Sequence, residues 1–210
     1  MKHLIIIGAG GYGREMFGVA RDAVGFGTAF DIRGFLDARA DALDGFRGYP
    51  PVIGSPSDYV PQPDDVFVAA LGDGNARRRC AGAVEARGGK FMAVVHRTAH
   101  LGPNVSVGEG AFVAPHVTLT ADVRVGRHTV VFYGAMVGHD GVLGDYAHVH
   151  SSCTLGGGVR LGEGAVVYPG AVVLPRLEIG ARAVVGAGST VIADVKPGTT
   201  VFGSPARPIK

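Results

Sequence analysis

Residues 131–155 read VFYGAMVGHDGVLGDYAHVHSSCTL, and every sixth residue of this stretch, beginning with Val131, is Val or Leu. The same spacing extends in both directions, so that sixteen consecutive positions are aliphatic. These positions are Leu101, Val107, Val113, Leu119, Val125, Val131, Val137, Leu143, Val149, Leu155, Leu161, Val167, Val173, Ile179, Val185 and Val191. A fixed period of this kind is the mark of a repeat architecture.

The period of six differs from the 3.6 of an α-helix and from the 2 of a simple strand. It fits a short strand followed by a turn, with three hexads, or 18 residues, in each triangular coil and the aliphatic residue pointing inward. The fifth residue of a hexad is mostly small and fits the inside of a corner. The second residue is commonly Gly, which we expect to supply the backbone angles of a tight turn. The pattern resembles the hexapeptide repeat of left-handed parallel β-helix acyltransferases and predicts a little over five stacked coils.

The N-terminal half has a different pattern. Leu4–Ile7 is an all-apolar run typical of a buried parallel strand, the string GAGGYGRE follows, and Glu15–Ala23 is predicted to be a helix. Gly8, Gly10 and Gly13 satisfy G-x-G-x-x-G, in which glycines let the backbone approach a phosphate at a helix N-terminus. The domain lacks strands for a full NAD site, so a mononucleotide or sugar nucleotide is the favoured ligand. The alternative is a tight turn without a ligand.

Three more strands are predicted in this half. Ile32–Leu36 ends at Asp37, an acidic residue placed to bind a ribose hydroxyl, and Val66–Leu71 precedes the turn Gly72–Asn75 and a basic helix. Phe91–Val95 is the last strand. We therefore expect a small Rossmann-like α/β domain over residues 1–95 and a left-handed parallel β-helix with a C-terminal tail over residues 96–210.

Composition excludes several classes of function. The formal net charge of +2 gives no sign of a nucleic-acid partner. The two cysteines, Cys80 and Cys153, lie far apart, and Cys153 takes an inward small-residue position, so neither a disulfide nor a metal pair is expected. The apolar run Leu4–Ile7 is too short for a signal peptide or a membrane span. A cytoplasmic protein is the expectation.

One histidine has a carboxylate beside it at a predicted turn. His139 and Asp140 occupy the third and fourth positions of a hexad. Imidazole exchanges protons near neutral pH, and a carboxylate fixes its tautomer, so the pair is a candidate general base. A solvated surface pair is the alternative.

Other residues are placed by the 18-residue coil. Gly157 stacks on His139, where a bare backbone N–H can stabilise an oxyanion, unless the Gly156–Gly158 run is only a wide turn. His148 and His150 flank Val149 and either face a groove between subunits or pack at an edge. His116 and His128 are expected on the surface.

Together these strings carry a resemblance that covers the whole chain. IIIGAGGYGRE, GFLDA, LGDGNARRR, GHDGVLGDYAHVH and the terminal GSPAR are similar to the nucleotide-sugar acetyltransferases. That family includes the bacillosamine and perosamine N-acetyltransferases and the sialic acid O-acetyltransferase group. The resemblance implies an acetyl-CoA-dependent N-acetyltransferase of a nucleotide-activated amino sugar in cell-surface glycan biosynthesis. It also implies a homotrimer whose active sites lie between subunits.

The resemblance assigns roles to residues. His139, Asp140 and Gly157 are the catalytic group, and Gly157 also binds the acetyl-CoA thioester. His148 lies near the acetyl donor, and we expect the pantetheine arm along Gly186, Ala187 and Gly188, with Arg207 at the CoA phosphates. The predicted sugar-nucleotide site consists of Gly8, Gly10, Gly11, Asp37, Gly72, Asp73 and Asn75. No metal is expected.

Alternative functions remain. An O-acetyltransferase of a sugar or sialic acid would use the same residues, and a non-catalytic scaffold would bind nucleotides alone. A γ-type carbonic anhydrase shares the β-helix, but its H-x4-H pair is absent and it has no Gly-rich α/β domain. Asp37 is followed by Ala38, whereas family members often have two acidic residues there, so the nucleotide is left unassigned.

Overall fold

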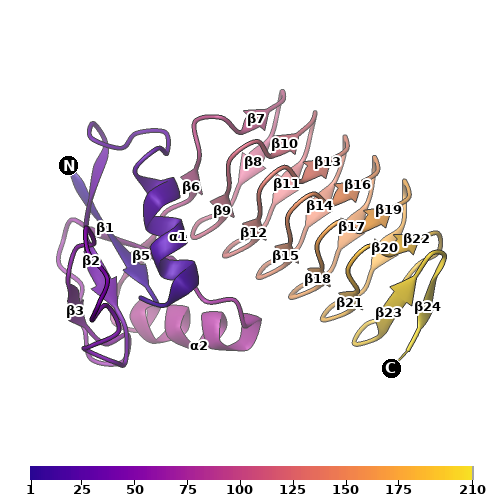
Figure 1. Ribbon diagram of the computed structural model, residues 1–210. Helices are drawn as coiled ribbons and strands as arrows, with labels where there is room; N and C mark the ends of the chain where they lie inside the picture. The colour runs from indigo at the N-terminus through magenta and orange to yellow at the C-terminus, as the bar shows by residue number, and fades with distance from the viewer. Residues whose placement is uncertain (210) are drawn as a thin grey trace. The chain divides into compact units, whose positions relative to one another are not determined.

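The computed structural model describes residues 1–209 (Figure 1). The chain divides into two compact units, one from Met1 to Arg97 and one that begins at Thr98. The division lies two residues beyond the boundary expected from the change of period. Each unit is described by itself below.

The N-terminal unit is built on a five-stranded parallel sheet with the spatial order β3-β2-β1-β4-β5. Its strands are β1 (Lys2–Ile7), β2 (Phe30–Leu36), β3 (Val52–Gly54), β4 (Asp65–Ala69) and β5 (Lys90–Phe91). The chain moves outward from β1 to β3 on one side and then returns to β4 on the other. Ligands of open α/β sheets bind at the carboxyl ends of the strands beside such a reversal.

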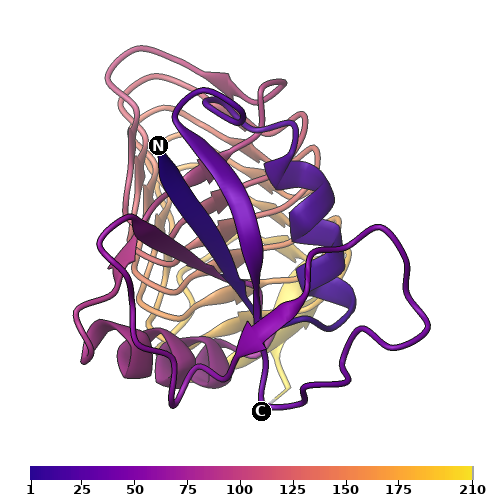
Figure 2. The ribbon, with the colours of Figure 1, turned by 90° about the vertical axis from the view of Figure 1, so that its left-hand side faces the viewer.

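Two helices cover opposite faces of this sheet (Figure 2). Side chains alternate along a strand, so Phe35 and Leu36 point to different faces. Leu36 belongs to the core cluster that contains Ala81 and Val84 of α2 (Gly74–Glu85). Phe35 lies beside Gly13 of α1 (Gly11–Ala20), since a Cβ built on Gly13 would be 3.6 Å from the Phe35 ring. The unit is therefore doubly wound, as its sequence predicts.

Several predicted element bounds are wrong in the N-terminal unit. Helix α1 runs over Gly11–Ala20 rather than Glu15–Ala23, because the glycine-rich string itself forms its first turn. Strand β3 was not predicted, since it is only three residues long and follows two prolines. The predicted last strand, Phe91–Val95, splits into β5 and β6 (Val94–Val95), and only β5 joins the sheet of this unit. Strand β4 also starts and ends earlier than predicted.

A buried carboxylate joins three segments of this unit. Asp65, 3% exposed, accepts hydrogen bonds from the Arg33 guanidinium at 2.7 Å and from the Tyr59 hydroxyl and the Gln62 N–H, both at 2.8 Å. Burial alone would raise the pKa of Asp65, but these donors outweigh it and hold the pKa below 3.8. Burial and the Asp65 hydrogen bond raise the pKa of Tyr59 to about 12.

The second unit is a left-handed parallel β-helix whose coils stack at 18-residue intervals (Figure 1). Its first sheet contains, in spatial order, β22 (Thr190–Val191), β19 (Val172–Val173), β16 (Thr154–Leu155), β13 (Met136–Val137), β10 (Thr118–Leu119) and β7 (His100–Leu101). Its second contains β20 (Glu178–Ile179), β17 (Arg160–Leu161), β14 (Val142–Leu143), β11 (Arg124–Val125) and β8 (Ser106–Val107). Its third contains β24 (Ala206–Pro208), β23 (Thr200–Gly203), β21 (Val184–Val185), β18 (Val166–Val167), β15 (His148–Val149), β12 (Val130–Val131) and β9 (Phe112–Val113).

The inward positions form the core of this unit, as predicted. Of the sixteen aliphatic positions, all but Leu101 and Val107 of the first coil are buried. The small fifth residues fill the inside of the corners; Cys153 is one of them, fully buried, and burial raises the pKa of its thiol to about 11. The register ends near Val195, since Val185 pairs with Val201, sixteen residues later rather than eighteen.

Two positions at each corner of the β-helix, the second and the fourth residue of a hexad, have different backbone requirements. The fourth residue of each hexad from Asn104 to Gly188 has a left-handed backbone, and nine of these residues are not glycine. The glycines at the second position have no such angle. A Cβ on Gly126, Gly138 or Gly144 would instead lie less than 3 Å from the backbone of the next coil. The expected role of these glycines is therefore wrong, because close approach and not backbone angle requires them.

One predicted surface histidine is buried. His128 is fully enclosed and stacks on Tyr146 with the ring centroids 4.8 Å apart. Its ring also fills the space beside Gly110, where a Cβ would collide with it. His116, at the comparable turn position, is exposed as predicted. Among residues 1–209, no helix is long and apolar enough to cross a membrane.

We predict that Asp65→Asn lowers the free energy of unfolding at neutral pH by about 2–3 kcal/mol, because a buried charged acceptor is lost. Since the folded pKa of Asp65 is depressed, its contribution is complete well above the ordinary pKa of a carboxyl and is lost as pH falls through that value to the folded one. The variant therefore loses less stability on acidification than the parent. Urea denaturation between pH 3 and 7 measures both effects.

The matched control is Asp64→Asn. Asp64 is the neighbouring residue and pairs with Lys2 at 3.2 Å on the surface, where an ion pair contributes at most about 1 kcal/mol. Equal losses in the two variants would contradict the assigned role of Asp65.

Candidate functional site

The His139–Asp140 pair lies on one turn between β13 and β14. His139 Nδ1 is 2.7 Å from Asp140 Oδ2, and both side chains are about two-thirds exposed. Asp140 has the left-handed backbone of the corner, with φ of 59°. When Nδ1 donates its proton to the carboxylate, Nε2 is left as the proton acceptor. This is the arrangement that a general base requires.

Gly157 lies directly against the other side of the imidazole. A Cβ built on Gly157 would be 2.5 Å from His139 Nε2, so no side chain fits there without displacing the ring. The Gly158 N–H donates to the His139 carbonyl at 2.7 Å and fixes the two turns together. The structure thus brings Gly157 and His139 together, as the 18-residue coil predicts.

The backbone N–H of Gly157 is available to a ligand. Within residues 1–209 it donates to no hydrogen bond, whereas the Gly157 carbonyl accepts one from the Arg176 N–H at 2.9 Å. A free amide beside the candidate base can stabilise the charge that develops on a carbonyl oxygen during acyl transfer.

The residues predicted to hold acetyl-CoA do not all lie at this corner. We define the first edge as the turns that follow the strands of the first sheet, including 138–141 and 156–159, and the third edge as those that follow the third sheet. His139 and Gly157 lie on the first edge. Gly186, Ala187 and Gly188 lie on the third edge, on a different side of the coil.

His148 belongs to the third sheet and is 3% exposed. Its ring stacks on His150 at 4.0 Å and on Phe132 at 5.2 Å. His150 in turn stacks on Tyr168 at 4.9 Å. Phe132, His150 and Tyr168 thus form an aromatic ladder on the third edge, and Phe202 packs over Gly186 at its end. Within one chain, His148 is a packed residue and not a neighbour of His139.

Arg207 is exposed on β24 and lines a pocket of about 480 Å³ at the C-terminal end of the β-helix. Lys196, Ala193 and Asp194 also line it. Ala193 takes the first-edge position of His139 three coils later, a separation of about 14 Å at the usual strand spacing. Lys196 was missed, although it marks the end of the sixfold register in the sequence.

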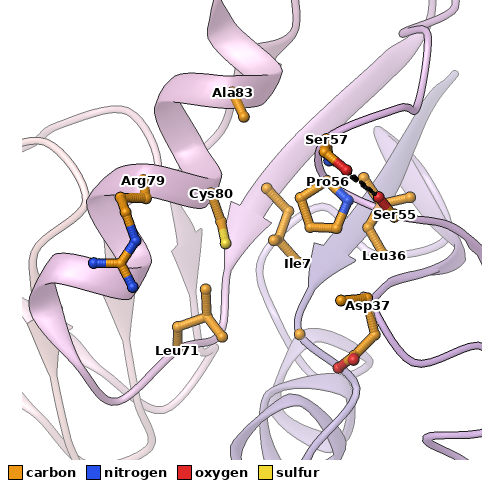
Figure 3. A pocket seen from close by; sticks show the side chains of 12 residues that line it. Ile7, Leu36, Asp37, Ser55, Pro56, Ser57, Leu71, Arg79, Cys80 and Ala83 are labelled. Atoms are coloured by element: carbon orange, nitrogen blue, oxygen red, sulfur yellow. Dashed lines mark hydrogen bonds between the residues drawn. The ribbon is translucent and has the colours of Figure 1, made fainter.

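The N-terminal unit has its own pocket, of about 360 Å³, at the carboxyl ends of its strands (Figure 3). Gly8 and Asp37, two of the residues predicted for the sugar-nucleotide site, line it, and the Cys80 side chain points into it from α2. The other lining residues are Ile7, Leu36, Ala38, Ser55, Pro56, Ser57, Leu71, Arg79 and Ala83. The pocket lies where the strand order reverses, which is the expected position for a nucleotide.

Asp37 binds the glycine-rich loop. Its carboxylate accepts hydrogen bonds from the Ala9 N–H at 2.9 Å and from the Arg39 N–H at 3.0 Å. Burial would raise the pKa of Asp37, but these bonds and the Arg39 charge hold it below its usual value. Asp37 therefore remains an anion that orders the loop beside the pocket.

The glycine-rich loop leaves a helix end open. Gly8 has φ of 101°, and a Cβ there would be 2.8 Å from the Ala70 carbonyl, so only glycine fits. Gly10 caps α1 without a side-chain hydrogen bond, and no acidic residue lies in the first turn. Gly10 and Gly11 have open space where a side chain would be. Free N–H groups at such a helix end favour anions.

The predicted turn residues after β4 are not part of the pocket lining. The Asp73 carboxylate caps α2 by accepting from the Ala76 N–H at 2.6 Å, and Gly72 and Asn75 are exposed. Ser55, Pro56 and Ser57 were missed because strand β3, which they follow, was missed. The α2 residues Cys80 and Ala83 lie in no motif, and Arg79, the last residue of the string LGDGNARRR, was given no role. Within residues 1–209, no group of three histidine, cysteine or carboxylate side chains is placed to hold a metal.

Comparisons with known proteins cover both units. Residues 3–84 match the PglD N-terminal domain, and residues 158–193 match the bacterial transferase hexapeptide family. The Caulobacter crescentus protein PerB, in complex with CoA and GDP-perosamine, is 29% identical over all of this chain and 98% of its own, with a TM-score of 0.88.

A second solved structure is the acetyltransferase domain of PglB from Neisseria gonorrhoeae in complex with acetyl coenzyme A. It is 29% identical over 99% of both chains, with a TM-score of 0.88. Among curated proteins, the acyl-[acyl-carrier-protein]–UDP-N-acetylglucosamine O-acyltransferase of Pseudomonas putida is 33% identical over 86 residues. That match spans 41% of this chain and only a third of the relative.

The two family matches identify an α/β unit of the PglD type and a hexapeptide β-helix. The two solved structures align with both units, over 99–100% of the chain. The chain therefore belongs to the nucleotide-sugar acetyltransferase family of left-handed β-helix hexapeptide-repeat proteins.

Proposed function

We propose that this protein is an acetyl-CoA-dependent N-acetyltransferase of a nucleotide-activated amino sugar. The observation that carries the proposal is the contact between His139, paired with Asp140, and the bare backbone of Gly157. Solved relatives that align over the whole chain contain CoA and GDP-perosamine in one case and acetyl coenzyme A in another. The pocket beside Gly8 and Asp37 is the proposed nucleotide site.

The mechanism follows from this geometry. The neutral amine is the nucleophile, its ammonium form having first lost a proton to solvent. His139 Nε2 removes one proton from the amine nitrogen as it attacks, and Asp140 stabilises the imidazolium that forms. The amine nitrogen attacks the thioester carbonyl, and the Gly157 N–H stabilises the oxyanion. Collapse of this intermediate forms the amide and expels CoA, whose thiolate takes the proton held by His139. No covalent enzyme intermediate is required, because binding both substrates supplies the proximity.

The CoA moiety fits along the first edge. Beyond Gly157 the corner continues through Pro175 to Ala193, which lines the pocket that contains Lys196 and Arg207. We assign the thioester to Gly157 and the CoA phosphates to the two cations of this pocket, whose lining residue Ala193 lies two coils, or about 10 Å, beyond Gly157. Lys and Arg both bind phosphate, Arg in a bidentate manner.

The third-edge residues suggest why the site needs a second chain. His148, Gly186, Ala187 and Gly188 lie on a different edge from His139, so they reach acetyl-CoA bound at Gly157 only if they belong to a neighbouring subunit. Tyr168 and Phe202 leave apolar surface exposed on the third edge, at 43% and 52%. We propose a trimer in which the first edge of one subunit faces the third edge of the next.

The trimer predicts a mass in solution of three times the 21.5 kDa chain. Sedimentation equilibrium at micromolar concentration measures it. Exchange of both Tyr168 and Phe202 for Ser is expected to lower the association constant, because exposed apolar surface drives such contacts. A monomer that is fully active would contradict the shared site.

If His139 is the general base, we predict that His139→Asn strongly lowers kcat/KM. We expect kcat/KM to fall by about 10²–10⁴ with UDP- and GDP-linked amino sugars, because the general base is lost. Asp140→Asn keeps a residue type that tolerates the left-handed backbone and is expected to lose less. Thiol release from acetyl-CoA measures both. The control is His116→Asn, an exposed turn histidine outside the site, which is expected to keep parental turnover.

The same assay separates N- from O-acetylation. Amino sugars and the corresponding hydroxyl sugars are compared on each nucleotide, and acetyl transfer is expected only to the amine. Transfer to the hydroxyl sugar alone would favour the O-acetyltransferase. Normal turnover by His139→Asn would contradict the assigned base, whichever acceptor is used.

Gly157→Ala tests the oxyanion site separately. The added methyl group overlaps the His139 imidazole and displaces the base by a fraction of an ångström or more. A misplacement of this size lowers kcat by about a hundredfold. Gly157 does not have a left-handed backbone, so thermal stability is expected to change little. Gly82→Ala, with open space around it, is the control. Unchanged kcat in Gly157→Ala would rule out the close contact as part of the mechanism.

A further inference from the structure

The open end of α1 has a cation beside it. Arg14 lies one turn into the helix, and its guanidinium turns back to the loop, where it donates to the Ala9 carbonyl at 3.5 Å. One guanidinium nitrogen is 4.0 Å from the position that a Gly11 Cβ would take. The charge of Arg14 thus adds to the partial positive charge of the helix end, and no acidic side chain in the first turn offsets either.

An aromatic ring holds this cation in place. The Phe46 ring lies under the Arg14 guanidinium, with 3.6 Å between the guanidinium carbon and the ring centroid. Within residues 1–209, Arg14 forms no ion pair with a carboxylate. The difference matters, because a carboxylate partner would neutralise Arg14, whereas a ring orients it and leaves its charge available to an anion.

Phe46 is placed by the long connection between β2 and β3, which Figure 2 shows as the loop beside the lower end of α1. Tyr49 anchors the connection by packing on Phe17 at 5.3 Å and Phe35 at 6.5 Å. The Phe46 N–H donates to the Leu43 carbonyl at 3.0 Å and closes a turn. Phe46 is 49% exposed, so its burial does not explain its position.

The residue that Arg14 contacts, Ala9, is adjacent in the chain to Gly8, which lines the pocket of the N-terminal unit. Gly8 lines the pocket, Ala9 contacts Arg14, and Gly10 and Gly11 leave open space between them. A diphosphate that leaves the pocket along this loop meets the free N–H groups of α1 and then the Arg14 guanidinium. Arg is suited to this role by its planar, bidentate donors.

We propose that Arg14 binds the diphosphate of the nucleotide sugar and that Phe46 is the residue that positions it. The inference rests on the proposed function for the identity of the sugar ligand, but not for the binding of a nucleoside diphosphate. It assigns a role to the β2–β3 connection, for which the sequence motifs gave none.

Calorimetric titration with UDP and GDP tests the proposal on the full chain, with uridine and guanosine as phosphate-free counterparts. We expect Arg14→Ala to weaken binding of whichever diphosphate the parent binds by about tenfold or more, the value of a charged hydrogen bond. The affinity for the matching nucleoside is expected to stay the same. Arg87→Ala is the control, since Arg87 lies beyond the C-terminal end of α2, is exposed, and its guanidinium donates to the Ala83 carbonyl at 2.8 Å.

The role of Phe46 is tested by asking whether its effect on diphosphate binding requires Arg14. Phe46→Leu keeps apolar bulk but removes the ring face and is expected to weaken diphosphate binding about two- to fivefold, whereas Phe46→Tyr retains it. In the Arg14→Ala background, Phe46→Leu is expected to have no further effect, because the ring acts through the guanidinium. Thermal denaturation of each variant checks that the loop is folded.

Three results overturn the proposal. The parent protein binds neither UDP nor GDP, or Arg14→Ala loses affinity for the nucleoside and the diphosphate equally. The third is that Phe46→Leu weakens binding as much in the Arg14→Ala background as in the parent. Because binding is measured without acetyl-CoA, these results are independent of catalysis. If the diphosphate results hold but no sugar nucleotide is acetylated, the proposed function fails and the Arg14 assignment stands.

Discussion

Backbone of one coil touches backbone of the next at the corners of the β-helix, and the rest of the second unit depends on that contact. At Gly138 the approach is close enough that a Cβ would lie 2.5 Å from the Gly157 nitrogen. The same closeness of the two coils sets Gly157 against the His139 ring, where a Cβ would lie 2.5 Å from Nε2. A side chain at Gly138 would disturb the packing of the coils, whereas one at Gly157 would displace the His139 imidazole.

In the proposed function the two units divide the work of substrate recognition. The α/β unit offers a pocket at the strand ends, an open helix N-terminus and a cation held by an aromatic ring, all suited to a nucleoside diphosphate. The β-helix offers a base, a backbone amide beside it and a cationic pocket at its C-terminal end. Each set of groups is fixed by backbone packing within its own unit, so neither site requires the chain to fold around its ligand.

The sequence predicted the β-helix well because its signal is long-range and redundant. Sixteen aliphatic positions define the coil, and the coil length alone places Gly157 against His139. Orientation within a corner was harder to predict. His128 and His116 hold the same hexad position, yet Gly110 and Tyr146 enclose only His128. Burial there depends on neighbours one coil away, which the hexad position does not specify.

The α/β unit was predicted less completely, since its motifs are local. The glycine string and Asp37 were found, but Ser55, Arg79 and Cys80 reach the pocket only through the three-dimensional fold. The Arg14–Phe46 contact joins residues 32 positions apart through a loop with no strand or helix pattern. The role of His148 stays a prediction, because its ring packs in the third sheet of its own chain, away from His139.

The uniform coil also makes the β-helix a molecular ruler. His139 and Ala193, which lines the pocket with Lys196 and Arg207, lie on one edge, and their separation is three whole coils. Gain or loss of 18 residues between them would leave every inward side chain in place and change that separation by one step of about 4.8 Å. Any other length would rotate the following residues onto different edges. Among proteins of this architecture, the reach of the acyl carrier can therefore change only in discrete increments.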